Sequence, residues 1–475
     1  MKLKGICQWM NKNRCAEIIY FLLSTFIICG QALYNGYPLV TNDSGIYILS
    51  SFSLIPPIRF PIGYGLFIRI FSWEYTMWMV IYVQALIMNL LIYKAISLAI
   101  PTKKNYFIHL SIIIFLVLFS SLGWYSSQLM PDIFTPGIFL IFFILLIKPK
   151  LSVLDAFVYL TVLFFFLICQ LNNLLTSALS ILTFLILLLF RSKVVIDRAN
   201  AFKRLLLLST GLICSVIFLM IYQYYNGNGF RLSLEPHVLL AVRLSENGLL
   251  RRYLDENSDR LGNQIYQDIK LMPITSHDFF QTNKSHNELM RSSIGEWKRA
   301  DSLYAPIVYG IMTTPRYLIK YIWENVKGTG IQLYKLNVGD EIRAFRENSL
   351  PYLAIKDHLD NDGNEFLHTS QNYGKLKFNT IDFINYFVIG ISLILIFWSF
   401  FNGRISKSII LLNVICLLGY FYNAVVTTSL IGISSHLQSR ISWLLVLDAM
   451  IIMYSLIYQT FNLSLLKPAR PESDI

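Results

Sequence analysis

A carboxylate and an arginine stand near the start of the chain, in a stretch that is otherwise apolar and rich in proline. Asp43 lies within Thr-Asn-Asp-Ser-Gly, and Arg59 follows within Pro-Pro-Ile-Arg-Phe-Pro. Because prolines restrict the backbone on both sides of Arg59, we expect its side chain to be held at a fixed height. A carboxylate can accept a proton from a hydroxyl group, and a guanidinium can bind a phosphate through two parallel hydrogen bonds. The pair therefore suits transfer to a hydroxyl acceptor, although an acidic helix cap and an arginine at lipid headgroups would explain the same residues.

Three further residues with suitable chemistry come later in the chain, again beside apolar stretches. Asp132 directly follows Pro131, where a carboxylate complements the dipole of a helix that begins there. The same carboxylate could tune the pKa of a nearby acid or help to bind a metal ion. His436 and Arg440 are one helical turn apart, so on a continuous helix both can face one site. The alternative for Arg440 is a side chain that reaches to lipid headgroups.

Several common sources of catalytic chemistry are missing from the sequence. It contains no Walker loop, no glycine-rich dinucleotide fingerprint after a strand, no Cys/His spacing that fits zinc, and no Gly-x-Ser-x-Gly elbow. The six cysteines all lie outside residues 226–380, so no disulfide framework is predicted for that polar segment.

The composition is that of a membrane protein. Hydrophobic residues make up 55% of the chain and charged residues 14%, whereas a soluble domain carries roughly 25% charged residues. The formal net charge of +12 does not indicate nucleic-acid binding, because the basic residues gather in short connections between apolar runs. A span needs about 20 apolar residues. The segments that qualify are approximately 16–35, 75–98, 106–123, 131–147, 151–169, 173–190, 205–224, 381–401, 408–426 and 441–461.

This pattern predicts an all-α polytopic membrane protein of about ten transmembrane helices with both termini in the cytoplasm, because an even number of spans puts the basic connections on one side. The first predicted domain, residues 1–225, holds helices 1–7 and the first loop (residues 36–74), which carries Asp43. Residues 226–380 form a mainly helical extracytoplasmic domain inserted between helices 7 and 8. Residues 381–475 hold helices 8–10 and a short cytoplasmic tail.

The inserted segment 226–380 is polar, nearly neutral in charge, and has helix signals. Residues 236–257 show apolar residues at helical spacing, and Thr314-Pro315 is typical of a helix start. We interpret the run 317–323 as part of a soluble helix that packs on its own domain, with a helix lying along the membrane surface as the alternative. The sequence Asn-Asp-Gly-Asn at 361–364 predicts a turn.

These residues together resemble a known family. A first span followed by Asp43, then Tyr47, the proline-rich stretch around Arg59, and a second loop that ends in Pro131-Asp132 is similar to the GT-C glycosyltransferases. That superfamily includes the protein O-mannosyltransferases and the bacterial transferase that adds aminoarabinose to lipid A. The resemblance is best over about residues 15–150 and is weaker at Arg440 and Trp443. The chain departs from the family pattern because Ser44 follows Asp43, where an Asp-Glu pair is usual, and because the large polar segment interrupts the spans.

The resemblance implies a divergent bacterial member of the superfamily, in the inner membrane, with its site on the periplasmic face. A sugar would move with inversion from a polyprenyl-phosphate donor to a glycan, lipid or protein acceptor, and no nucleic acid would take part. Asp43 would be the general base, Asp132 would support the acceptor or a metal site, and a divalent cation stays open as a cofactor. Arg59 and Arg440 would hold the lipid phosphate. The further substrate-binding residues would be Tyr47, Tyr64 and His436.

Two other classes of protein stay open from the sequence. An O-antigen ligase or polymerase also carries large external loops but relies on Arg and His, so His436 rather than Asp43 would be essential. A transporter or scaffold would need no catalytic residue. Transporters often show repeated halves and polar residues near the bilayer midplane, whereas this sequence has no visible repeat and its notable charges cluster at the predicted external surface.

Overall fold

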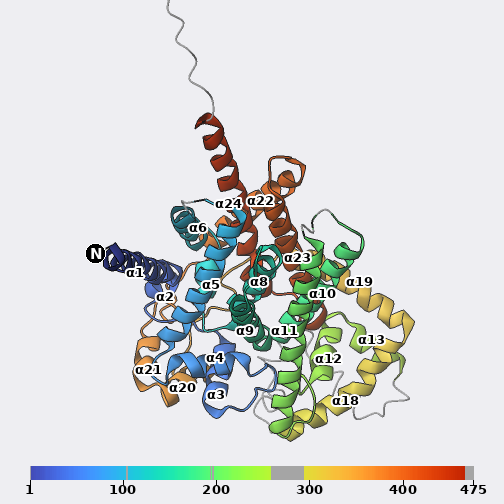
Figure 1. Cartoon of the computed structure of the whole chain (residues 1–475). Helices are drawn as coiled ribbons and strands as arrows, with labels where there is room; N and C mark the ends of the chain where they lie inside the picture. The colour runs from blue at the N-terminus through green and yellow to red at the C-terminus, as the bar shows by residue number, and fades with distance from the viewer. Residues whose placement is uncertain (1, 103–104, 193, 195–196, 258–293, 466–475) are drawn as a thin grey trace, which may run out of the picture.

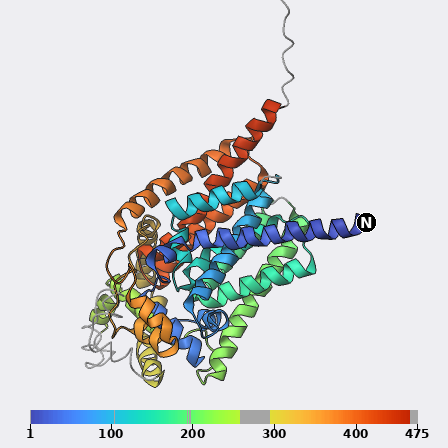
Figure 2. The ribbon, with the colours of Figure 1, turned by 90° about the vertical axis from the view of Figure 1, so that its left-hand side faces the viewer.

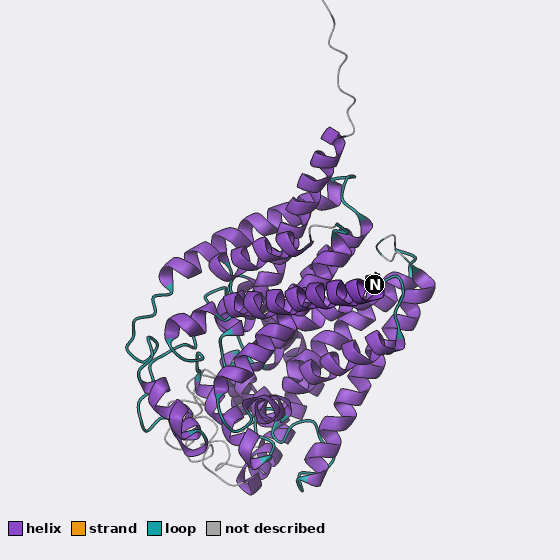
Figure 3. Cartoon of the chain, turned by 60° about the vertical axis from the view of Figure 1, so that its left-hand side comes forward, coloured by secondary structure: helices purple, strands orange, loops and turns teal. Residues whose placement is uncertain are grey.

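The computed structural model of the chain describes residues 2–102, 105–192, 194, 197–257 and 294–465. In this part of the chain every regular element is a helix, and extended pairing is limited to one isolated bridge between Leu39 and Gln128 (Figure 3). The all-α prediction is confirmed.

The helices run along the chain in the following order (Figure 1). The first half holds α1 (Lys2–Ile28), α2 (Gly30–Asn35), α3 (Asn42–Ser53), α4 (Gly63–Ser72), α5 (Met77–Ala99), α6 (Asn105–Phe119), α7 (Leu122–Ser126), η1 (Pro131–Ile133), α8 (Phe134–Ile147), α9 (Val153–Cys169), α10 (Leu171–Leu189) and α11 (Arg198–Tyr225). The second half holds α12 (Pro236–Glu246), α13 (Leu249–Glu256), α18 (Ile294–Thr313), α19 (Pro315–Leu333), α20 (Leu350–His358), α21 (Asp360–Leu367), α22 (Asn379–Phe401), α23 (Lys407–Leu430) and α24 (Ser435–Leu465).

Six of these helices are long and apolar enough to cross a membrane: α5, α10, α11, α22, α23 and α24. Four shorter apolar helices lie at the other predicted span positions. They are the second half of α1 (Cys15–Ile28), α6, the continuous stretch of η1 and α8 (Pro131–Ile147), and α9. Large apolar side chains point outward from the long helices; Ile394 of α22, for example, is 70% exposed. Since water would oppose such exposure, the chain has the surface of a membrane-embedded helical protein.

Two of the predicted spans are interrupted. The first breaks between α1 and α2, and the third breaks before α7. The breaks let α2 pack against the region of α7: the Nε2 atom of Gln31 donates to the carbonyl oxygen of Val117 at 3.1 Å, and the backbone N of Ala32 donates to Oγ of Ser127 at 3.1 Å. Hydropathy does not locate these breaks, because apolar residues continue on both sides of them.

The first loop holds two helices, α3 and α4, which pack against each other, and α3 also packs against α20. Figure 1 shows α20 and α21, in orange, beside α3 and α4, in blue, although hundreds of residues separate them in the chain. Gly45 permits the close approach of α3 to α20, because a Cβ atom there would lie 2.9 Å from the backbone N of Pro351. The inserted segment therefore helps to hold the first loop in place.

The inserted segment 226–380 divides into two parts with different cores. Side chains of α12, α13, α18 and α19 form a small hydrophobic cluster of their own, which also contacts Ile58 of the first loop. Side chains of α20, α21 and their neighbouring loops belong instead to the main core shared with the apolar helices. The described part of the segment is thus helical as predicted, but it is not one separately packed domain. Figure 2 shows α18 to α21 at one end of the long helices, away from the N-terminus.

Two local predictions in the inserted segment have different outcomes. Thr314 is the N-cap of α19 and Pro315 its first residue, as predicted. The turn predicted at 361–364 is wrong, because these residues lie inside α21. Asp362 explains the difference, since its carboxylate oxygen Oδ2 accepts hydrogen bonds from the hydroxyl of Tyr37 and the backbone N of Met77, both at 2.9 Å. These contacts with distant residues outweigh the local preference for a turn.

Candidate active site

The first loop is fixed by backbone hydrogen bonds to the second loop (residues 124–130). The backbone N of Leu39 donates to the carbonyl oxygen of Ser127 at 2.8 Å, and the backbone N of Leu129 donates to the carbonyl oxygen of Leu39 at 2.9 Å. Asp43 and Asp132 follow closely after the two paired segments. The bridge therefore sets how far apart these two carboxylates lie.

Buried glutamines support this arrangement from both sides. Gln84 of α5 donates its Nε2 to the carbonyl oxygens of Ser126 at 2.9 Å and Gln128 at 2.7 Å. Gln371, which follows α21, contacts both backbone polar groups of Val40: its Oε1 accepts from the backbone N at 3.1 Å, and its Nε2 donates to the carbonyl oxygen at 2.6 Å. Since buried backbone groups need partners, these two side chains stabilise the one conformation of the loops that brings the acids together.

Asp43 lies in the first turn of α3, and its neighbours cap that helix. The backbone N of Thr41 donates to Oγ of Ser44 at 2.9 Å, and the hydroxyl oxygens of these two residues are 3.2 Å apart in a capping box. The side chain at position 44 is therefore fully buried and used by the cap.

Asp43 as a residue is partly exposed, and its carboxylate lies within electrostatic range of four other charged or titratable groups. Burial is the largest influence and raises the pKa of Asp43 above its usual value. Arg59 opposes this effect and lowers the pKa, as does His436, whereas Glu341 and Asp132 raise it. A carboxylate with a raised pKa is a stronger base, so its surroundings suit Asp43 for accepting a proton.

Arg59 follows the buried prolines of the first loop and lies beside an aromatic cluster. Its guanidinium carbon is 5.3 Å from the centre of the Phe60 ring. The Tyr47 ring packs against Phe60 and Tyr64, with ring centres 5.0 Å and 5.2 Å apart. Tyr47 and Tyr64 are 1% and 0% exposed, and the Tyr64 hydroxyl donates to Oε1 of Gln84 at 3.0 Å. The structure thus brings both predicted tyrosines close to Arg59, but as packed residues of the core.

Asp132 and Arg440 form a buried ion pair. Nη1 of Arg440 lies 2.7 Å from Oδ1 of Asp132, and the two side chains are 1% and 3% exposed. Arg440 also donates to Oε1 of Gln170 at 2.8 Å and to Oδ1 of Asn423 at 3.0 Å. Gln170 in turn donates to Oδ1 of Asp132 at 2.7 Å. The sequence suggested separate roles for the acid and the arginine, and the structure joins them in one network.

His436 lies in the first turn of α24, one turn before Arg440, at the partly exposed edge of this network. Its Nδ1 is 3.2 Å from Oε1 of Glu341 and 2.9 Å from Oγ of Ser434. Its carbonyl oxygen accepts a hydrogen bond from the Tyr125 hydroxyl at 3.0 Å. His436 and Glu341 therefore form a second pair of opposite charge when the histidine is protonated, within electrostatic range of Asp43.

Glu235 is a further acid near Arg59 that sequence reasoning missed. It is fully buried just before α12, and within the described ranges neither of its carboxylate oxygens has a hydrogen-bond partner. Burial raises the pKa of Glu235 to about 8, against an opposing influence of Arg59. Glu235 and Glu341 were hidden among the many acids of a nearly neutral polar segment. The proline after Glu235 marks a helix start, but no local signal shows that the acid is buried.

All the predicted site residues therefore gather at the same end of the long helices, around Asp43 and Arg59. Asp43, Arg59 and His436 are partly exposed, whereas Asp132, Arg440 and the two tyrosines are buried behind them. Within the described ranges no group of three or more His, Cys, Asp or Glu side chains could hold a metal ion.

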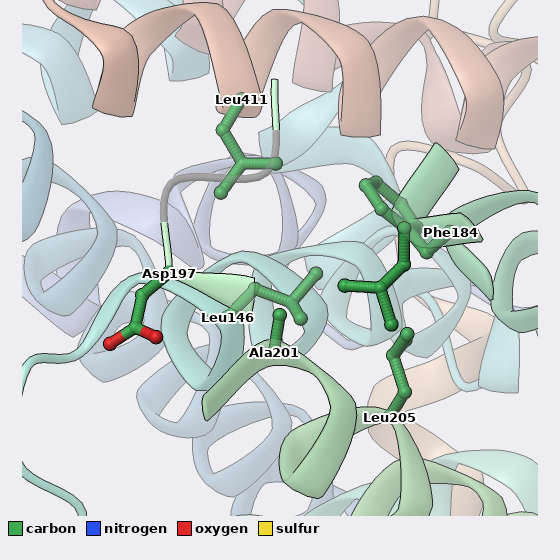
Figure 4. A pocket seen from close by; sticks show the side chains of 7 residues that line it. Leu146, Phe184, Asp197, Ala201, Leu205 and Leu411 are labelled. Carbon is green, nitrogen blue, oxygen red and sulfur yellow. The ribbon is translucent and has the colours of Figure 1, made fainter. Parts of the chain in front are cut away.

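A crevice elsewhere in the helix bundle carries no comparable chemistry (Figure 4). It is lined mainly by leucines, with Phe184 and Asp197 at its margin, and has a volume of about 10 Å³. The Asp197 carboxylate caps α11 by accepting a hydrogen bond from the backbone N of Asn200 at 3.2 Å. A space of this size holds about one water molecule, so the crevice is a packing defect near a helix start.

No family model, no curated protein and no solved structure matches this chain.

Proposed function

We propose that this chain is an inverting membrane glycosyltransferase that moves a sugar from a polyprenyl-phosphate donor to a hydroxyl group of an acceptor. The observation that supports this most is the meeting of Asp43 and Arg59. Asp43 as a residue is partly exposed, burial of its carboxylate raises its pKa, and the Arg59 guanidinium lies within electrostatic range of it. Both belong to a loop fixed by hydrogen bonds at several points.

In the proposed reaction Asp43 accepts the proton of the acceptor hydroxyl while that oxygen forms a bond to the anomeric carbon. The bond between the anomeric carbon and the phosphate oxygen breaks, and its electron pair leaves with the polyprenyl phosphate. Arg59 stabilises the negative charge that develops on this phosphate. Direct displacement inverts the configuration of the sugar. The products are the glycosylated acceptor and polyprenyl phosphate, and water then removes the proton from Asp43.

The buried network gives Asp132 and Arg440 a positioning role in this proposal. Their ion pair joins η1 to α24, so it holds Asp132 near Asp43 and orients His436 at the start of α24. Arg440 is fully buried and donates to three protein acceptors. Arg59 is partly exposed and lies within electrostatic range of Asp43, so the proposal assigns the donor phosphate to Arg59.

The same proposal places the chain in a bacterial inner membrane. In this proposal the six helices that are long and apolar enough to cross a membrane act together with the four shorter apolar helices as ten spans, and both termini lie in the cytoplasm. The end of the bundle that holds Asp43 then faces the periplasm. A lipid-linked donor lies at the membrane surface, which explains why the site lies where apolar helices meet polar loops.

The proposal is tested with the full chain in proteoliposomes and a panel of polyprenyl-phosphate monosaccharides. The wild-type protein is expected to release polyprenyl phosphate from at least one donor when an extract of envelope glycans supplies the acceptor, as measured by mass spectrometry. Asp43→Asn should lower the rate by about 10²–10⁴-fold, the usual contribution of general base catalysis, and Arg59→Gln by about 10²–10³-fold. Glu347→Gln, at an exposed acid, is the control. Wild-type turnover in Asp43→Asn would refute the assignment.

A second candidate, an enzyme of the O-antigen ligase or polymerase class, is favoured by one observation. The His436–Glu341 pair gives the site a histidine whose ring could take part in proton transfer. His436→Ala and Asp43→Asn separate the two candidates in the same proteoliposomes. If His436→Ala abolishes turnover and Asp43→Asn does not, the second candidate replaces the first.

A further inference from the structure

A polar pocket of about 410 Å³ lies between the start of α12 and the first half of α18. Its walls include Phe230, Arg231, His237, Lys298 and Asp301. This volume is within the range of about 300–1,000 Å³ found for small-molecule sites. None of the residues assigned to the reaction above lines this pocket.

The charges on the pocket walls favour an anion. Both oxygens of Asp301 are engaged by α12: Oδ1 accepts from the backbone N of His237 at 2.8 Å, and Oδ2 lies 2.9 Å from Nδ1 of the same residue. Asp301 is 11% exposed and the His237 side chain 41% exposed. Since Nδ1 of His237 pairs with Asp301, the other ring nitrogen, Nε2, is the one that a ligand in the pocket can contact. Asp301 is the one carboxylate among the described wall residues, and its oxygens are hydrogen-bonded to α12. The two cations Arg231 and Lys298 therefore determine the charge that faces a ligand in the pocket.

The remaining wall favours a ring rather than a bare ion. Phe230 is 62% exposed and lines the pocket next to Arg231. Its aromatic face can pack against the apolar face of a sugar ring, while nearby hydroxyl and charged groups bind the polar substituents. Ser233 and Ser302 supply such hydroxyl groups at the pocket walls.

The pocket is also connected to the site of the proposed reaction. Glu235 lies between the wall residues Ser233 and His237 in the chain, and its carboxyl group is within electrostatic range of Arg59. The Ile58 side chain beside Arg59 packs on the cluster formed by α12 and its neighbours. A molecule bound in the pocket therefore lies on the Arg59 side of the site.

We propose that this pocket binds an anionic saccharide of the acceptor, a sugar ring that carries a carboxylate or phosphate group. Arg231 and Lys298 bind the acidic group, Nε2 of His237 accepts a hydrogen bond from a sugar hydroxyl, and Phe230 packs against the ring. The role of this saccharide as the acceptor rests on the proposed transferase function. Binding of the saccharide to the pocket requires neither donor nor turnover.

The test is calorimetric binding to the full chain in nanodiscs, with no donor present. Three probes are used: a tetrasaccharide of alternating glucuronic acid and N-acetylglucosamine, the neutral tetramer of N-acetylglucosamine, and inorganic phosphate. The acidic tetrasaccharide is expected to bind at least tenfold more tightly than either of the others, and its affinity should fall as salt rises. Equal binding of the neutral tetramer would overturn the anionic part of the proposal, and equal binding of inorganic phosphate would overturn the saccharide part.

Variants locate the binding. The double variant Arg231→Gln/Lys298→Gln should raise the Kd of the acidic tetrasaccharide at least tenfold, and Phe230→Ala should raise it while keeping the preference for the acidic probe. Arg299→Gln is the matched control, since this arginine is exposed, follows Lys298 on the same helix and does not line the pocket. An unchanged Kd in the double variant, with an unchanged melting temperature, would refute the site.

The Asp43→Asn variant separates this proposal from the function on which it rests. It should bind the acidic tetrasaccharide with the wild-type Kd, because Asp43 does not line the pocket. If Asp43→Asn keeps turnover, the catalytic assignment fails while the binding result stands. If binding is absent in every variant and in the wild type, the pocket proposal fails whatever the outcome for turnover.

Discussion

The Arg440→Gln substitution removes a positive charge from a place that has almost no contact with water. Counted over the whole residue, Arg440 is 0% exposed and its partner Asp132 2% exposed. The substitution leaves the Asp132 carboxylate buried, with Gln170 as its remaining donor at 2.7 Å. The expected result is a large loss of stability, whatever the protein catalyses.

The magnitude follows from the geometry of the pair. Two unit charges about 4 Å apart attract by about 4 kcal/mol at an effective dielectric constant near 20, and breaking a buried pair by removing one partner costs about 3–5 kcal/mol. The structure places Nη1 of Arg440 2.7 Å from Oδ1 of Asp132, a direct contact. We therefore expect Arg440→Gln and Asp132→Asn each to lower the free energy of unfolding by about 3–5 kcal/mol.

The double variant Asp132→Asn/Arg440→Gln should be more stable than either single variant, because it leaves no uncompensated charge and both amides can still form hydrogen bonds. Unfolding in detergent micelles with a rising fraction of SDS measures all three free energies, and the double-mutant cycle gives the coupling. Arg316→Gln is the control: it breaks the pair with Glu256 at 3.2 Å, where Arg316 is 63% exposed, and should cost about 0–1 kcal/mol. Additive losses in the double variant, or single variants as stable as the control, would refute the buried pair.

Three other predictions concern packing, protonation and the bilayer. Gly45→Ala should lower the melting temperature because its methyl group meets the backbone of Pro351, with an overpacking cost of about 1–3 kcal/mol. The control Gly390→Ala should not lower it, because a Cβ atom there meets no atom within 4 Å. Equal melting temperatures of the two variants would contradict the close packing of α3 on α20. Burial raises the pKa of Glu235 from 4.5 to about 8, so the folded state holds a proton that the unfolded state has lost; stability should fall as the pH rises from about 4.5 to about 8 and then level off. Glu235→Gln should remove this fall, so between pH 5 and pH 9 its melting temperature should drop less than that of the wild type. If the melting temperatures of variant and wild type change in parallel with pH, Glu235 is not buried. A nitroxide at Val326→Cys, in a variant without the native cysteines, should be more accessible to oxygen in the bilayer than to a water-soluble nickel complex; the opposite order would make α19 a soluble helix.

The last of these predictions departs from the sequence interpretation of α19, which favoured packing on a soluble domain. One face of α19 does pack inward, with Tyr317 5% exposed and the Tyr321 hydroxyl donating to the carbonyl oxygen of Ser429 at 2.7 Å. The opposite face exposes Ile322, Trp323 and Val326 at 53%, 57% and 58%. Because α19 packs along the apolar helix α23, we predict that this exposed apolar face contacts lipid. Apolar spacing in the sequence showed both faces but did not show which one was covered.

Local features of the sequence determined the class of fold and singled out most charged residues of the candidate site. Long apolar runs specify helices because the backbone must satisfy its own hydrogen bonds in lipid, and this requirement does not depend on how the helices pack. Asp43 and Arg59 were found because charges are scarce around them. The cap of α19 was found because threonine followed by proline has a local preference for a helix start.

Tertiary structure alone decided which of the charged groups meet. Asp132 and Arg440 are 308 residues apart, and no pattern along the chain pairs them. Glu341 and Glu235 had no local mark in a segment with many acids, and Asp362 was assigned to a turn because its partners Tyr37 and Met77 lie far away in the sequence. A charge in the interior is stable only with a partner or with a shifted pKa. The identity of that partner depends on which helices pack together, so the roles of these residues became visible only in the folded chain.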